Sequence, residues 1–244
     1  MKVIGQEDKE KGRGTIEMPL RPSQYAERTL LTSVLNGTYP PGTALPNERS
    51  LSLLMGVTRP TLRETLHRLA GEGWFTIRHG KPTLVNDYWS RGGMGLLSTI
   101  SKYVEYLPED FITNLLELRV SLLPIIARLA ADNSPGIIIA YLDKSNQLEE
   151  DASAFSEYDW GLQTLMARKT GNPIYVLLLN DFEYVFKSLA SIYFSRKSSR
   201  RDSRIYYKDL KTAMARGGID AGLIVKTTME KSVTIWKKIK TTIK

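Results

Sequence analysis

Residues 45–85 carry cationic side chains whose spacing suits contact with double-stranded DNA. Arg59 and Arg63 stand four residues apart, so both lie on one face near the start of a helix. A guanidinium group in this position can donate two hydrogen bonds to the edge of a guanine in the major groove. Arg49 precedes them, and His79 and Lys81 follow. These residue types indicate recognition of DNA rather than catalysis.

The residues around these cations predict a helix, a tight turn and a second helix. Gly56 suits the left-handed conformation that closes a helix, and Thr58 suits the N-cap of the next one. Leu62, Leu66 and Leu69 then recur at helical spacing and form one apolar stripe for packing. The two arginines lie off this stripe and are free to face a partner.

A β-hairpin is expected directly after the second helix. Residues 74–78 alternate in polarity, as a strand with one buried face does, and residues 83–85 form the returning strand. The tip between them is basic, so His79 and Lys81 can reach into a minor groove. This order of elements is typical of a winged helix-turn-helix. The alternative is a helix-turn-helix used only for packing, with arginines that are merely solvated.

The composition is that of a globular protein, with 244 residues, 42% hydrophobic residues and a net charge of +8. The net charge is +3 in residues 1–90, −6 in residues 91–160 and +11 in residues 161–244. Because the DNA-binding part is not the most basic, its affinity must depend on a few well-placed cations and on dimerisation. There are no cysteines, no signal peptide is recognisable, and no apolar run is long enough to span a bilayer. We therefore expect a cytoplasmic protein without a membrane partner.

The chain as a whole is predicted to be mainly α, in four segments. Residues 1–19 form a loose arm, residues 20–87 the winged helix-turn-helix with a preceding helix at 23–36, and residues 88–94 a linker. Residues 95–244 are expected to form an all-α helical bundle that serves as the effector and dimerisation domain. Its helices are predicted near residues 95–104, 109–132, 135–150, 152–170, 173–194, 203–216 and 219–240.

The second domain offers little chemistry for a metal or for catalysis. Its sequence contains no histidine, because His67 and His79 both lie in the head. Asp159 is a possible metal ligand, but a solvated or capping carboxylate is the better interpretation. There is also no glycine-rich phosphate loop and no GxSxG elbow, so we expect no metal, no cofactor and no enzymatic activity.

What remains for the second domain is an apolar cavity with a site for an anionic head group. Aromatic residues concentrate in the last sixty residues, with arginines and lysines between them. Large aromatic side chains line ligand pockets, and arginines capture phosphates. The alternative is that the aromatic residues are core and that SRKSSRRDS (residues 195–203) is a solvated loop.

The head resembles the GntR family of bacterial regulators, through LPNER, GVTRPTLRETLHRLAGEGW and HGKPT. The similarity continues in QYAERTLLTSVLNGTYPPGT, VNDYW, ITNLLELRV and AFSEYDWGLQTLMARKTGNPIYVLLLN, and then in IYF and IW. These segments resemble the FadR subgroup, whose members regulate fatty acid metabolism and respond to acyl-CoA. The resemblance covers roughly residues 22–240 and is closest in the head.

The resemblance implies roles for individual residues. Arg49, Arg59 and Arg63 match arginines on the two motif helices, His79 matches the wing-tip histidine that enters the minor groove, and Thr58 and Thr61 match positions that contact phosphate. The positions that match the surroundings of the acyl-CoA pocket are Arg119, Tyr193, Tyr206, Ser232 and Trp236. Related regulators hold a metal with one aspartate and three histidines. Here Asp159 is present, but Gln163 replaces a histidine and the other two are missing.

Two positions depart from the family pattern. Pro60 replaces a residue that is usually polar, and proline has no N–H to donate to a phosphate. Thr228 and Met229 stand where the FadR pattern has tyrosine and glycine, so the methionine narrows the space for the coenzyme.

The resemblance thus implies a homodimer that binds a palindromic DNA operator and is released by long-chain acyl-CoA. Three alternatives remain open at this stage, of which an enzyme with a DNA-binding head is the least favoured because the sequence has no catalytic constellation. The second is a regulator of the same fold that senses a different small carboxylate metabolite. The third is a DNA-binding dimer that responds to no ligand.

Overall fold

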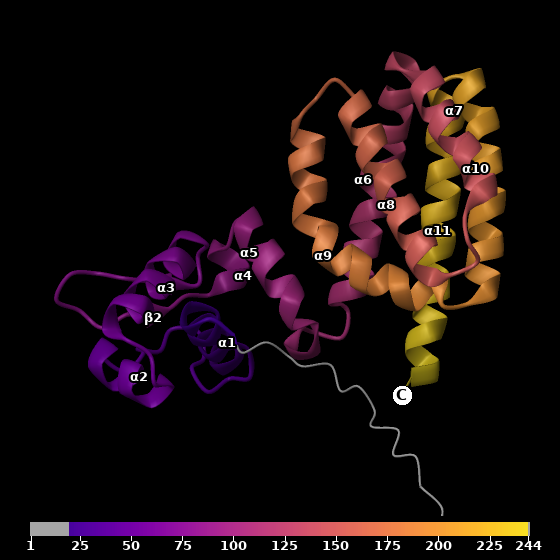
Figure 1. Cartoon of the computed structure of the whole chain (residues 1–244). Helices are drawn as coiled ribbons and strands as arrows, with labels where there is room; N and C mark the ends of the chain where they lie inside the picture. The colour runs from indigo at the N-terminus through magenta and orange to yellow at the C-terminus, as the bar shows by residue number, and fades with distance from the viewer. Residues whose placement is uncertain (1–19, 244) are drawn as a thin grey trace, which may run out of the picture.

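The computed structural model describes residues 20–243 of the chain and is built mainly of helices. Figure 1 shows two lobes, a head at the N-terminal side and a larger helical bundle that contains the C-terminal half. In the described part of the chain no single helix is both long and apolar enough to cross a membrane. The bent pair Phe111–Asn133 and Pro135–Gln147 meets that test together by length and composition. The predicted arm, residues 1–19, lies outside the described residues.

The head contains the predicted winged helix-turn-helix. Its helices are α1 (Pro22–Leu35), α2 (Glu48–Met55) and α3 (Arg59–Gly71), followed by the hairpin of β1 (Phe75–Thr76) and β2 (Leu84–Val85). The strands are antiparallel, with Phe75 opposite Val85. The predicted first strand, residues 74–78, is therefore too long, since only two of its residues pair in the ladder. Residue 44 adds one further bridge to β2.

The core of the head is formed by the apolar stripe of α3 against α1 and the hairpin. Leu62, Leu66 and Leu69 are at most 1% exposed and pack with Leu30 and Trp74. Burying each of these side chains contributes about 1.5–3 kcal/mol. The helix that carries the candidate DNA-reading arginines is thus fixed by its buried face.

The predicted linker, residues 88–94, is not a loose connection. Residues Tyr88–Arg91 form the short helix α4, and Met94–Ile100 form α5, so only two glycines separate the helices. A Cβ on Gly73 would lie 3.0 Å from the Arg91 carbonyl oxygen, because this segment packs closely against the end of α3. The prediction of a soft linker was wrong, because glycines here permit close packing as well as flexibility.

The sequence predicts that residues 95–244 belong to the bundle, but the first of these residues pack into the core of the head. Leu96 and Ile100 of α5, with Tyr103 of the 3₁₀ segment η1 (Ser101–Tyr106), join the same buried cluster as Trp74. Phe182 from the bundle reaches this cluster too. The head and the bundle are therefore joined by a continuous apolar core at residues 94–106.

The bundle consists of α6 (Phe111–Asn133), α7 (Pro135–Asp143), η2 (Lys144–Gln147), α8 (Ala152–Lys169) and α9 (Ile174–Phe194). The last two helices are α10 (Lys197–Arg216) and α11 (Gly218–Ile243). The helix predicted at 135–150 ends early and continues as a 3₁₀ turn. Helices α6 and α11 pack closely because Gly222 has no side chain, and a Cβ there would lie 3.1 Å from the Pro124 carbonyl oxygen.

One correction concerns the predicted loop SRKSSRRDS. Most of it is the first part of α10, where Arg200 is held by protein partners, as is Arg204 directly after the segment, while Arg196 and Arg201 are exposed. Arg200 is buried and Arg204 half-buried, and both donate to the carboxylate of Glu150, Arg204 at 2.6 Å. The sequence suggested a solvated loop because the carboxylate that neutralises these arginines lies some fifty residues away.

Candidate DNA-reading surface and candidate ligand cavity

The turn between α2 and α3 has the geometry that the sequence predicts. Gly56 closes α2 in the left-handed conformation, with φ of 64°. The Thr58 hydroxyl oxygen accepts a hydrogen bond from the Thr61 backbone N–H at 3.3 Å, so it caps α3. Asn47 caps α2 in the same way at 2.9 Å. Both helices therefore start at defined residues, which fixes the direction of the side chains on their first turns.

The predicted DNA-binding cations line one open hollow of about 1,020 Å³ between α2, α3 and the hairpin. Its basic residues are Arg49, Arg59, Arg63, His67, Arg78, His79 and Lys81. Thr58 and Thr61 lie beside it, at the start of α3. The sequence prediction did not include His67 or Arg78. His67 could have been found as the residue one turn after Arg63, and Arg78 as the neighbour of the wing-tip histidine.

The arginines of this hollow are not equivalent. Arg63 donates two hydrogen bonds to the Glu48 Oε2 atom, from Nη2 at 2.6 Å and from Nε at 3.1 Å. This hydrogen bond holds the pKa of Glu48 below its ordinary value. Within residues 20–243, neither Arg49 nor Arg59 forms an ion pair within 4 Å. Arg59 is thus free to meet a base, whereas Arg63 is already oriented by a carboxylate.

Pro60 lies in the first turn of α3, where its missing N–H breaks no helical hydrogen bond. The start of α3 therefore offers one backbone donor fewer to a phosphate, as the sequence suggested. The hydroxyls of Thr58 and Thr61 lie 2.8 Å apart at this end of the helix. They are hydroxyl groups that remain there to contact a phosphate.

The bundle encloses a cavity between α6, α8, α9, α10 and α11. All five predicted ligand-binding residues line it, namely Arg119, Tyr193, Tyr206, Ser232 and Trp236. Most of its other walls are leucine and phenylalanine. The space that the centre of a water molecule can reach is about 80 Å³, so the cavity is narrow in this conformation.

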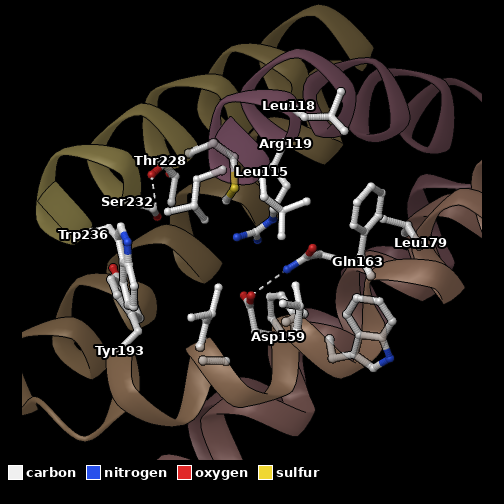
Figure 2. Close-up of a pocket in the computed structure, with 18 of the residues that line it drawn as sticks. Leu115, Leu118, Arg119, Asp159, Gln163, Leu179, Tyr193, Thr228, Ser232 and Trp236 are labelled. Atoms are coloured by element: carbon white, nitrogen blue, oxygen red, sulfur yellow. Dashed lines mark hydrogen bonds between the residues drawn. The ribbon is translucent and has the colours of Figure 1, made fainter. Parts of the chain in front are cut away.

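Figure 2 shows that the cavity has two different ends. Tyr193, Ser232 and Trp236 lie at one end, where hydroxyls and an indole can meet a polar group. Leu118 and Leu179 lie at the other end. This arrangement suits an elongated ligand with one polar end and one apolar end.

Arg119 and Asp159 reach toward each other from opposite walls in the middle of the cavity. Burial lowers the pKa of Arg119 and raises the pKa of Asp159, and the opposite charge of each counteracts the other's shift. The Nε of Arg119 is buried without a hydrogen-bond partner among the described residues, and its guanidinium lies 5.1 Å from the ring centre of Phe186. A buried donor without a partner is costly, so Arg119 is ready to bind an acceptor on a ligand.

The interpretation of Asp159 as a solvated or capping carboxylate was wrong. Asp159 is 8% exposed, and it accepts hydrogen bonds from Gln163 at 2.7 Å and from the Tyr207 hydroxyl at 3.3 Å. Gln163 thus takes the place where a metal ligand would stand and donates to the carboxylate instead. In the part of the chain that the structure describes, no group of three or more histidines, cysteines or carboxylates could hold a metal ion.

Met229 lies in the wall of the cavity with Thr228. Its side chain is 5% exposed and occupies space that a glycine would leave open. Met229 thus takes up part of the cavity, and its effect on the space for a coenzyme stays a prediction.

Comparisons with known proteins agree with this two-part construction. The sequence profile of the bacterial regulatory proteins of the gntR family matches residues 22–85, and that of the FadR C-terminal domain matches residues 86–244. The chain is 39% identical over 223 residues to the fatty acid metabolism regulator protein of Shewanella sp. (strain ANA-3), covering 90% of this chain and 91% of that protein. The protein of the same name from Shewanella oneidensis is 38% identical over 223 residues, covering 90% of this chain and 92% of that protein.

A solved structure shares the fold at low sequence identity. It is that of Lar, reported to control expression of the Listeria monocytogenes agr system, with a TM-score of 0.59 and 16% identity. The match covers 90% of this chain and 97% of Lar. This family is one of transcription regulators and not a class of enzymes. The chain therefore belongs to the gntR family of bacterial regulatory proteins and carries the FadR C-terminal domain after its gntR head.

Proposed function

We propose that this protein is a homodimeric regulator of fatty acid metabolism that binds a palindromic DNA operator and leaves it when a long-chain acyl-CoA binds. The observation that carries the effector claim is the cavity itself. It combines long apolar walls, one polar end and a buried guanidinium, Arg119, whose Nε has no partner among the described residues. The relatives that cover nine-tenths of the chain are named as fatty acid metabolism regulators.

On DNA, α3 of each head would enter the major groove by its N-terminal turns. Arg59 and Arg63 would donate to guanine edges, Arg49 would contact a base or phosphate from α2, and His79 with Lys81 would enter the minor groove. The two heads of a dimer require two half-sites about 34–36 Å apart, which is one turn of the double helix. Thr58 and Thr61 would then lie against the phosphates.

In the effector domain, the polar end of the cavity would hold the thioester and the start of the coenzyme. Tyr193, Ser232 and Trp236 line that end, and the guanidinium of Arg119 lies beyond it. Burial raises the pKa of Tyr193 and of Tyr206, so both hydroxyls stay protonated and can donate. Because the cavity is narrow, an acyl chain must push helices apart as it enters. That displacement gives the ligand different affinities for two conformations, as allostery requires.

The displacement would reach the head through residues 88–106. Trp74 of the head core packs on Tyr88 with ring centres 5.0 Å apart, and Tyr88 packs on Trp89 at 5.6 Å. Trp89 in turn lies 6.1 Å from Phe111, the first residue of α6. A shift of α6 can therefore change the position of the head and the spacing of the two recognition helices.

The same cavity supports a second candidate, a small carboxylate metabolite. The reason is its size, since about 80 Å³ holds a small acid more easily than a long chain, and Arg119 would pair with its carboxylate. Thermal-shift measurements with short carboxylic acids, with and without divalent metal, separate this candidate from acyl-CoA. Stabilisation by a small acid but not by oleoyl-CoA would favour it.

Calorimetry on the full-length protein tests the proposal. Oleoyl-CoA should bind much more tightly than free coenzyme A, because the acyl chain supplies most of the buried apolar surface. In a parallel titration, oleoyl-CoA should weaken binding to the operator. Absence of oleoyl-CoA binding, or binding that leaves operator affinity unchanged, would refute the effector claim while leaving the DNA claim intact.

A matched pair of variants connects the binding to the cavity. The Ser232 and Thr234 hydroxyls both donate to the carbonyl four residues earlier, at 3.0 and 3.1 Å, but only Ser232 lines the cavity. Ser232→Ala should weaken oleoyl-CoA binding, and Thr234→Ala should not. Equal effects of the two changes would show that the ligand binds elsewhere.

A further inference from the structure

A second apolar cleft lies between the bundle and the head, and we call it the junction cleft. Its volume is about 440 Å³. It is lined by Trp89, Leu97, Pro108, Asp110, Phe111, Asn114, Leu115, Leu118 and Phe182. Helices α4, α5, α6 and α9 thus all contribute to it. Among the described residues, Asp110 is the one charged residue that lines it.

The junction cleft adjoins the ligand cavity. Leu115, Leu118 and Phe182 line both spaces, so they form the wall that the two share. In Figure 2 Leu118 lies at the apolar end of the cavity, opposite the end with Ser232 and Trp236. A ligand whose polar end sits near Trp236 therefore points its apolar end toward the junction cleft.

The sizes of the two spaces suggest that they are used together. The cavity offers about 80 Å³ and the junction cleft about 440 Å³. Along α9, Tyr193 and Phe182 are separated by about 16 Å of helix. A short acyl chain ends within this distance, whereas a long chain continues past Phe182.

The far side of the junction cleft is in contact with the head. Trp89 and Phe111 line the cleft and lie 6.1 Å apart by their ring centres. Trp89 also packs on Tyr88, which packs on the buried Trp74 of the head. Trp89 itself is 52% exposed, so it can move when a group enters beside it.

We propose that the junction cleft holds the methyl end of a long acyl chain, so that only chains long enough to pass Leu118 and Phe182 displace Trp89 and move the head. This inference rests on the proposed response to long-chain acyl-CoA and adds the place where the end of the chain binds. Most of the residues that line the cleft are apolar or aromatic, so each methylene that enters from water should tighten binding about fourfold.

The test compares decanoyl-CoA with oleoyl-CoA on the full-length protein. Asn114 lines the junction cleft but not the cavity, and it is exposed on α6, so Asn114→Trp fills the cleft without disturbing the core. Asn180→Trp is the matched control, because Asn180 is exposed on α9 and lines neither space. Binding of each acyl-CoA and release of the operator are measured for all three proteins.

With Asn114→Trp, the affinity for oleoyl-CoA should fall tenfold or more, on the order of two to three lost methylenes, while that for decanoyl-CoA stays the same. Operator release by oleoyl-CoA should weaken in parallel, and Asn180→Trp should resemble the wild type. Asn114→Asp gives a second measurement if the tryptophan variant does not fold, since a carboxylate in the cleft should also repel the chain end.

Three results would overturn the inference. If the preference of Asn114→Trp for oleoyl-CoA over decanoyl-CoA equals that of the wild type, the chain end does not enter the junction cleft. If decanoyl-CoA releases the operator as well as oleoyl-CoA does, the cleft plays no part in the coupling. If the wild type binds neither ligand, the proposed function fails and the inference fails with it.

Discussion

The head and the bundle hold their arginines in opposite ways. In the head, Arg49 and Arg59 are exposed on the surface of a small rigid core, and Arg63 is held by the neighbouring Glu48. In the bundle, Arg119 points into a narrow cavity, where its Nε has no hydrogen-bond partner among the described residues. An exposed arginine stays hydrated, so it costs little folding free energy, and it can contact a phosphate or a base without rearrangement. A buried arginine is costly until a ligand supplies an acceptor.

This difference determines what the proposed function requires of the surface around α3 and of the cavity in the bundle. The candidate DNA-reading surface is already formed, because the turn, the two helix caps and the buried leucine stripe of α3 fix its geometry. On the proposed function, the cavity is ready only in part, because its space of about 80 Å³ would have to widen before an acyl chain could enter. A preformed surface suits recognition, and a site that must open suits a switch.

The largest effect is expected in the core of the bundle. Phe155 is fully buried and packs on Phe194, so Phe155→Ala should lower the free energy of unfolding by about 3–5 kcal/mol. The control is in the head, where Leu54 is 74% exposed and Leu54→Ala should cost less than about 0.5 kcal/mol. Urea unfolding measures both. A loss below about 1 kcal/mol for Phe155→Ala would contradict the assignment of this core.

Next comes the methionine that narrows the cavity. Met229→Ala should lower stability by about 2–3 kcal/mol and at the same time tighten oleoyl-CoA binding, because it enlarges the cavity. Met166 is fully buried but does not line the cavity, so Met166→Ala should lower stability without improving binding. Unfolding and calorimetry on the two variants give the comparison. Weaker binding by Met229→Ala would show that its side chain contacts the ligand instead of excluding it.

On the DNA-reading surface the expected effect is about 1–3 kcal/mol of discrimination. Arg59→Ala should weaken operator binding by that amount and binding to random DNA by much less. Arg63→Ala should cost less, since Arg63 must first give up its bonds to Glu48. Fluorescence anisotropy with operator and random duplexes measures both. Equal losses on the two DNAs would remove the base-reading role of Arg59.

The smallest effect concerns the buried carboxylate. Burial raises the pKa of Asp159, so the folded protein holds this proton more firmly than the unfolded chain does. The stability that the proton provides is present below the ordinary aspartate pKa of about 3.9 and is lost as pH rises through the folded value. Wild-type protein should therefore lose stability relative to Asp159→Asn as pH rises. Unfolding experiments from pH 4 to pH 7 test this prediction, with Asp209→Asn as the exposed control. If the difference in unfolding free energy between wild type and Asp159→Asn stays constant with pH, the raised pKa of Asp159 is excluded.

Sequence reasoning succeeded where the determinants are local. Gly56 in the turn, Thr58 at the helix cap and the leucine stripe of α3 all lie within a few residues of what they determine. It failed where the deciding contact comes from far away along the chain. Arg200 could not be recognised as buried, because its partner Glu150 lies fifty residues earlier. The burial of Asp159 could not be recognised for the same reason, since its hydrogen-bond partner Tyr207 lies far away along the chain.

The cavity residues were reached only through family resemblance. They come from four helices that meet only in the fold, and no spacing in the sequence could bring Arg119 together with Trp236. The junction cleft was not foreseen at all, because Trp89 and Phe182 become neighbours only when the head packs on the bundle.

One measurement tests the central claim most directly, that the head reads a defined operator and that the bundle releases it. DNA bound by the full-length protein is selected from a random pool, with and without oleoyl-CoA. We predict that one palindromic sequence is enriched without the ligand and that the enrichment is lost when oleoyl-CoA is present, but kept with free coenzyme A. Enrichment of the same sequence to the same degree under all three conditions would contradict the account.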